Sequence, residues 1–228
     1  MANSSSTWAD GCWAILRKDI QSEFRTRYAF NAVVVFAVTT LAVVSYSAQV
    51  VGAGARLLSP LLWIIILFSA MSGLSRTFVR EEDAGTANTL RLAADPTAVY
   101  VGKLLFNTVL LAVLNVLVVP LFLVLMDVSV GNLFLFVVIL ITGSTSIAAT
   151  ATFVAAIVSK ASVRSALFAV LSFPLLVPVL VAAVQGTEAS LRGASTVEGM
   201  PFVKILTAFA GAMVAVGLLL FEHVWDEV

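Results

Sequence analysis

The chain has 228 residues, of which 61% are hydrophobic and 11% are charged. Soluble domains carry roughly 25% charged residues, so the composition excludes a water-exposed globule and indicates a membrane protein. The 13 basic and 13 acidic residues balance, which argues against a nucleic-acid partner. The single cysteine, Cys12, excludes an internal disulfide framework and a cysteine-cluster metal site.

Residues 1–27 are predicted to form an amphipathic helix ahead of the first membrane span. Asp19 and Glu23 interrupt its apolar half, and Arg17 and Lys18 lie mostly opposite. Tryptophans with basic residues favour a helix in the cytoplasmic headgroup layer. The alternative is a helix packed on a protein surface, which is less favoured because no soluble domain is present to receive it. The apolar half of the helical wheel comprises Trp8, Cys12, Ile15, Leu16, Ile20 and Phe24.

Residues 28–228 are predicted to be an all-α polytopic membrane domain with six transmembrane helices. About 20 apolar residues span a bilayer, and the apolar blocks lack the polar outer face of a soluble bundle. With the N-terminus inside, ten of the 13 Lys and Arg residues fall on the cytoplasmic side, so both termini are predicted to be cytoplasmic. The predicted spans are Tyr28–Gln49, Leu57–Leu74, Val99–Met126, Leu133–Val158, Val163–Val184 and Phe202–Val224.

The loop between the second and third spans, from Arg76 to Tyr100, carries the densest charge. Its acidic residues would face the positive N-terminal dipole of a short helix, which Gly85 would break or bend. Asp95-Pro96 predicts the start of the next helix, with Asp95 as the N-cap. A short helix parallel to the membrane would transmit the motion of a partner, whereas the alternative is a solvated loop that only supplies inside charge. The predicted coupling residues are Arg80, Glu81, Glu82, Asp83, Gly85, Leu90 and Leu92.

Polar and helix-breaking residues inside the spans supply the remaining candidates. Pro174 and Pro178 predict a kink in the fifth span, either a hinge or a static bend. Asn107 and Asn115 are candidates to line a pathway, and the lack of an accompanying intramembrane acid or base disfavours proton coupling. The small hydroxyl cluster at residues 142–146 is expected to serve helix packing.

The sequence predicts that this chain is not an enzyme. Gly102-Lys103 lacks the Ser or Thr that a phosphate loop requires next, and position 97 is not glycine, so ATP is not hydrolysed through that motif. The only histidine, His223, is expected to be an interfacial anchor. We therefore expect neither a metal site nor a cofactor held by this chain alone.

Three segments carry a family resemblance. The first runs from Arg80 to Thr86 and continues through Leu90, Leu92, Asp95-Pro96, Tyr100, Gly102-Lys103 and Asn107; the second is Phe173–Leu180, and the third is Arg17–Arg27. Together they resemble the permease subunits of ABC-2-type exporters, and more narrowly the heme exporter permease family of cytochrome c maturation, CcmB. The resemblance covers nearly the whole chain.

The resemblance implies a multi-pass permease subunit of the cell inner membrane. It would couple ATP hydrolysis by a cytoplasmic CcmA-like ABC ATPase, docked on the charged loop, to heme export or release of a heme chaperone. A CcmC-like heme-handling membrane subunit or a second permease copy would complete the complex, with heme as the candidate cargo. Two alternatives stay open: an ABC-2-type permease that exports a lipid, polysaccharide or drug, and a membrane scaffold with no transport cycle.

Overall fold

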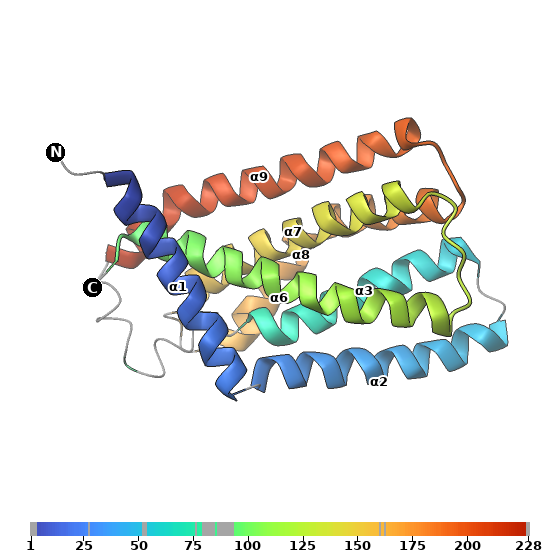
Figure 1. Ribbon diagram of the computed structural model, residues 1–228, viewed down its shortest axis with the longest axis horizontal. Helices are drawn as coiled ribbons and strands as arrows, with labels where there is room; N and C mark the ends of the chain where they lie inside the picture. Colours follow the sequence, from blue (N-terminus) through green and yellow to red (C-terminus); the bar gives the residue numbers. More distant parts are fainter. Residues whose placement is uncertain are drawn as a thin grey trace.

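All regular structure in the described part of the chain is helical (Figure 1). The computed structural model describes residues 4–26, 28–51, 54–75, 77–78, 85, 94–159, 161 and 163–226. These residues form α1 (Ser4–Thr26), α2 (Tyr28–Val51), α3 (Ala55–Leu74), α6 (Pro96–Leu125), α7 (Leu133–Val158), α8 (Arg164–Leu191) and α9 (Thr196–Asp226). The predicted N-terminal helix is α1, and each predicted span falls on one of the later helices.

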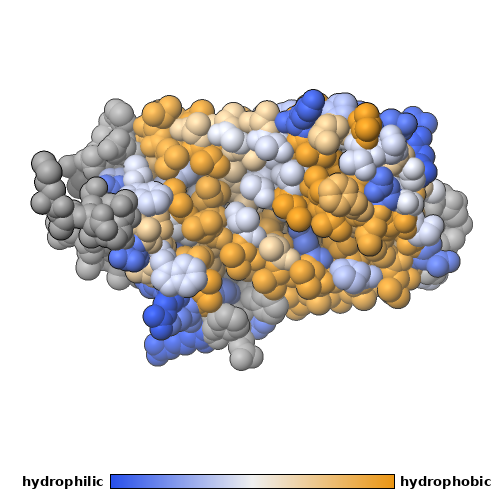
Figure 2. Space-filling model, turned by 45° about the horizontal axis from the view of Figure 1, so that its top comes forward, coloured by the Kyte–Doolittle hydropathy of each residue, from blue (hydrophilic) through white to orange (hydrophobic). Residues whose placement is uncertain are grey.

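The helices have the composition of a multi-pass membrane protein. Five of them, α3, α6, α7, α8 and α9, are long and apolar enough to cross a bilayer, and α2 adds a shorter apolar stretch, Val33–Tyr46. Figure 2 shows a largely apolar middle on one face of the molecule, with hydrophilic residues gathered toward the two ends. The membrane class predicted from composition is thereby supported, while the sixth span remains a prediction for α2.

Two helices, α3 and α7, form the centre of the bundle. In each of them 61% of the most apolar window is buried, against 17% in α9. Trp63 of α3 is fully buried, and its indole Nε1 donates a 2.8 Å hydrogen bond to Thr187 of α8. Its ring lies against Gly143 of α7, where an added Cβ would come within 3.0 Å of Cζ2. Trp63 therefore ties three helices together.

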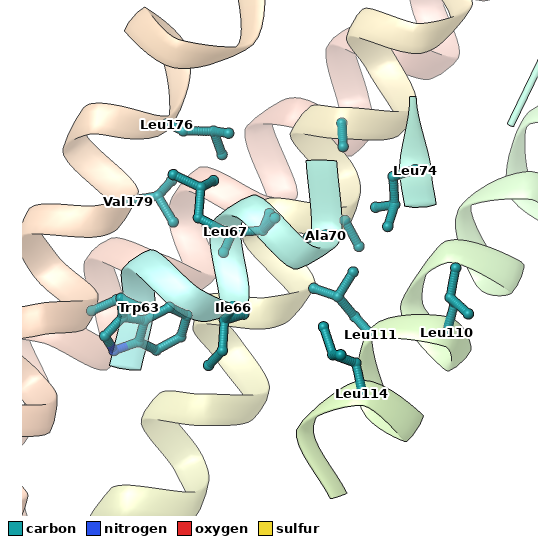
Figure 3. Close-up of a cluster of buried hydrophobic side chains, with 14 of the residues drawn as sticks. Trp63, Ile66, Leu67, Ala70, Leu74, Leu110, Leu111, Leu114, Leu176 and Val179 are labelled. Atoms are coloured by element: carbon teal, nitrogen blue, oxygen red, sulfur yellow. The ribbon is translucent and has the colours of Figure 1, made fainter. Parts of the chain in front are cut away.

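The apolar side chains of α3 fill the space between α6 and α8 (Figure 3). They are packed from both sides, which explains why a helix with so few polar groups occupies the core. The labelled side chains are Trp63, Ile66, Leu67, Ala70 and Leu74 of α3, Leu110, Leu111 and Leu114 of α6, and Leu176 and Val179 of α8.

The segment between the last two spans corrects a prediction. The predicted spans leave residues 185–201 as the connector between the fifth and sixth spans, yet α8 continues to Leu191 and α9 begins at Thr196, which leaves only residues 192–195 between the helices. The turn is held by Asn132, which follows α6: its side-chain Nδ2 donates to the carbonyl oxygen of Ala194 at 2.9 Å. Gly193 adopts a φ of +79°, and Gly131 packs directly against it. These contacts allow a tight turn where polarity alone suggested a longer loop.

At the opposite end of the bundle, α1 runs obliquely across the other helices, close to where both termini lie (Figure 1). The charged loop begins and ends at the same end, since it joins α3 to α6. This end of the bundle therefore holds most of the predicted functional features.

Candidate functional site

The helix α6 starts at the N-cap predicted from the sequence. Asp95 Oδ1 accepts hydrogen bonds from the backbone N–H of Thr97 at 2.9 Å and from its hydroxyl at 2.6 Å, and Pro96 occupies the first turn. The Thr97 hydroxyl, followed by the backbone amides of Thr97 and Ala98, holds the pKa of the Asp95 carboxyl below its usual range. The cap fixes the end of the charged loop onto α6. We call residues 95–107, with the side chains that contact them, the α6 junction.

The N-terminal helix packs directly on the α6 junction. Trp8 Nε1 donates a 2.8 Å hydrogen bond to the Thr97 hydroxyl. One turn further along α6, a Cβ added to Gly102 would lie 2.9 Å from Ile15 Cβ and 3.2 Å from the Cys12 carbonyl oxygen. Only glycine permits this close approach of the two helices. Cys12, Ile15 and Leu16 are all buried as a result.

This packing supports the alternative in which α1 packs on a protein surface. The N-terminal helix has a protein surface to pack on, and that surface is α6 of the same chain. Trp13 remains 66% exposed and Arg17 and Lys18 are also exposed, so the opposite face is free to meet the headgroup layer. The interfacial position of α1 stays a prediction.

A buried ion pair joins the same two helices. Lys103 Nζ lies 2.8 Å from Asp19 Oδ2, with Lys103 2% exposed and Asp19 8% exposed. Asp19, which interrupts the apolar half of α1, is thus matched by a cation on α6. Lys103 lies within α6, so the prediction that the spans hold no acid or base is wrong at this position. Ionisable residues in a membrane segment are typically paired, so the position of Lys103 near the start of a span was a signal that it has an acidic partner.

Tyr100 connects α6 to α9. Its side chain is fully buried, and its hydroxyl lies so close to Gly217 of α9 that no side chain fits there. The ring centroid of Phe221 lies 5.4 Å from that of Tyr100 and 5.4 Å from that of Phe78. Phe78 lies at the start of the charged loop, so the aromatic cluster joins the start of the loop to two helices.

Asn107 connects the start of the charged loop to α7. Its Oδ1 accepts from the Thr77 hydroxyl at 2.9 Å, and its Nδ2 donates to the Thr152 hydroxyl at 2.7 Å. Asn107 is fully buried, so both ends of its amide serve interhelical contacts in this conformation. Asn115 similarly donates to Ser144 of α7 at 2.6 Å. That either residue lines a pathway stays a prediction, and neither contact was predicted.

The hydroxyl cluster at residues 142–146 has the packing role predicted for it. Besides Ser144, which accepts from Asn115, Ser146 donates a 2.8 Å hydrogen bond to the backbone carbonyl oxygen of Leu206 on α9. These bonds join α7 to both α6 and α9, as expected for small hydroxyl residues between membrane helices.

Most of the predicted coupling residues, namely Arg80, Glu81, Glu82, Asp83, Leu90 and Leu92, lie outside the described residues. Gly85 is described and has a φ of +65°, a left-handed conformation that suits glycine. Thr77 and Asp95 hold the two sides of the loop on α6. The short coupling helix stays a prediction.

Pro174 and Pro178 both lie inside α8, which continues through them as a helix. Each lacks the N–H that would bond one turn back, so the carbonyl groups of Val170 and Pro174 lose their helical donors. Both prolines are exposed on the surface of the bundle. The arrangement permits local bending, and the hinge role is a proposal.

The opposite end of the bundle carries a pocket of about 690 Å³. Glu188 and Glu198 line it from α8 and α9, and Arg192 forms a 3.5 Å ion pair with Glu188. The pocket is shaped by the turn that Asn132 holds, and no predicted site residue contributes to it.

The fold and the α6 junction define a multi-pass, all-helical membrane protein whose loop, N-terminal helix and bundle meet at one polar and aromatic centre. The CcmB protein family matches residues 11–224, nearly the whole chain. The chain belongs to the CcmB family, and it is a permease-type membrane component of heme transport in cytochrome c biogenesis. No individual curated protein matches it.

Proposed function

We propose that this chain couples ATP hydrolysis by a partner subunit to heme export, or to release of a heme-loaded chaperone, during cytochrome c maturation. A cytoplasmic CcmA-like ABC ATPase would dock on the loop that includes Glu81 and Leu92. The observation that carries the proposal is that both sides of this loop are fastened to α6, through Thr77 to Asn107 and through the Asp95 cap. A force applied to the loop would therefore be transmitted to α6.

The contacts of the α6 junction would transmit such a force to the other helices. Asn107 would transmit the force to α7 through Thr152. Tyr100 would transmit it to α9 through Phe221 and Gly217. Buried hydrogen bonds and packed rings resist separation because a broken partner would be left without water. Motion of the loop is thus converted into motion of helices rather than absorbed locally.

The chain is proposed to be a non-catalytic subunit. Lys103, which with Gly102 resembles part of a phosphate loop, is buried against Asp19, so its ammonium group is engaged inside the protein. We place ATP hydrolysis in the partner, and the remaining membrane component is either a CcmC-like heme-handling subunit or a second copy of this chain. Both termini are proposed to be cytoplasmic in the inner membrane, with six spans including α2.

Deletion of the chain tests the heme assignment. In a host that makes c-type cytochromes, we expect the deletion strain to lose covalently bound heme, because apocytochromes would receive none. The measurement is heme staining after denaturing electrophoresis, with the wild-type chain restored from a plasmid as the control. Undiminished staining in the deletion strain would reject heme as the cargo and favour the alternative, an ABC-2-type permease for a lipid, polysaccharide or drug.

A further inference from the structure

The N-terminal helix is attached to α6 more firmly than a membrane anchor requires. Trp8 is hydrogen-bonded to Thr97, the backbone of α1 meets Gly102, and Asp19 is paired with Lys103. These three contacts are different in kind, and all fall on the first two turns of α6. Lipid alone would hold an interfacial helix without any of them.

The spacing of the contacts prevents α1 from pivoting on α6. Trp8 and Asp19 are eleven residues apart, which corresponds to about 16 Å along a helix that rises 1.5 Å per residue. A single contact would allow rotation, but two contacts at this separation, with a close backbone approach between them, fix the crossing angle. The two helices therefore form one body in this structure.

Separating the helices would break the 2.8 Å ion pair between Asp19 and Lys103 and leave the Asp19 carboxylate with only Lys18 of its own helix, whose Nζ lies 3.7 Å from Oδ1. In the described part of the chain, Asp19 Oδ2 has no hydrogen-bond partner apart from the ion pair with Lys103. Removing one member of a buried pair leaves an uncompensated charge, which is strongly unfavourable. A transport cycle that pulled α1 away from α6 would meet this cost in every turnover, so the motion must leave the pair intact.

We propose that α1 and the start of α6 move together as a rigid lever during the transport cycle, with Asp19 and Lys103 as the positioning residues that hold it together. The proposal rests on the proposed function. It makes α1 part of the path that carries motion from the ATPase into the bundle, rather than a fixed anchor past which α6 slides.

A disulfide between the helices provides the test. A Cβ placed on Gly11 would lie 3.6 Å from the Cβ of Ala98, within the range of about 3.5–4.5 Å found in disulfides. The variant Gly11→Cys/Ala98→Cys is made in a Cys12→Ala background, reconstituted with its ATPase partner in lipid nanodiscs, and oxidised. We expect efficient cross-linking and ATP turnover within about twofold of the reduced complex, a smaller change than mutations that alter coupling typically cause.

A rescue experiment separates coupling from general stability. Asp19→Asn is expected to lower permease-dependent ATP turnover by about threefold to tenfold, since it weakens the attachment of α1. The same variant carrying the cysteine pair should recover turnover on oxidation and lose it again on reduction. A complex with either cysteine alone is the matched control and should not respond to oxidation.

Three outcomes would contradict the proposal that α1 and the start of α6 move as a rigid lever. The first is failure of the cysteines to cross-link, the second is loss of turnover on oxidation of the otherwise unaltered complex, and the third is failure of the disulfide to rescue Asp19→Asn. ATP turnover that is the same with and without this chain would overturn the proposed function as well, whereas each of the three outcomes above leaves that dependence intact.

Discussion

Replacing Lys103 by alanine is expected to destabilise the protein by up to about 3–5 kcal/mol, because the buried Asp19 carboxylate would keep only the half-exposed Lys18, 3.7 Å away, as a cationic partner. Lys103 is 2% exposed and Asp19 8%, with 2.8 Å between Nζ and Oδ2. Solvent cannot replace the lost ammonium group at that depth. The expected result is a large fall in the midpoint of thermal unfolding in detergent, together with proteolytic cleavage of α1 under conditions in which the wild-type helix is protected.

The double variant Asp19→Leu/Lys103→Met is the matched control for this prediction. It removes both charges and keeps apolar side chains of similar size, and such replacements of buried pairs are often neutral or stabilising. We expect its unfolding midpoint to stay near that of the wild type. If Lys103→Ala is as stable as the double variant, the pair is not buried in the way described.

Trp63→Ala is expected to cost about 3–5 kcal/mol, in the range for large aromatic truncations in a packed core. Trp63 is fully buried at the centre of the bundle, where it contacts Gly143 and donates a hydrogen bond to Thr187. Alanine would leave a cavity shared by α3, α7 and α8, with Thr187 deprived of its donor. The measurement is the yield of folded, monodisperse protein after extraction, followed by thermal unfolding.

Trp63→Phe separates the two contributions at this site. It keeps most of the ring volume and removes the indole N–H, so we expect only the smaller loss of roughly 1–3 kcal/mol that an unsatisfied buried polar group causes. Equal effects of alanine and phenylalanine would show that packing volume at Trp63 contributes little, contrary to the buried position described.

The sequence predicted the helices well because apolar length is a local property. Span boundaries fall within three residues of the observed helices, except at the end of α8 and the start of α9. The Asp95-Pro96 start of α6 was also predicted, since capping depends on adjacent residues. The short turn at residues 192–195 was not predicted because it depends on Asn132 and Gly131. These residues lie about 60 residues earlier in the chain, and nothing in the local sequence indicates that they contact the turn.

The site was predicted less completely because its contacts depend on how helices are rotated against each other. Asp19 and Lys103 each carried a signal, an acid on an apolar face and a base at the start of a span, but nothing in the sequence paired them. Thr77 and Thr152 carried no signal, because hydroxyl residues are common in membrane helices. Only the fold shows that both meet Asn107. Gly102 belongs to one of the segments that carry the family resemblance. The reason that position 102 requires glycine is the close approach of α1, which is likewise a tertiary contact.

If ATP hydrolysis by a partner drives this chain, the drive reaches it through the charged loop. The most direct test is ATP turnover of the reconstituted complex, compared between the wild-type chain and the variants Glu81→Lys and Gly85→Pro. Charge reversal would oppose docking, and proline cannot adopt the φ of +65° observed at position 85. We expect both variants to insert into the membrane, to lose permease-dependent ATP turnover and to yield little holo-cytochrome c. Normal turnover and normal holo-cytochrome c in both variants, or ATP hydrolysis by the purified chain without its partner, would contradict the account.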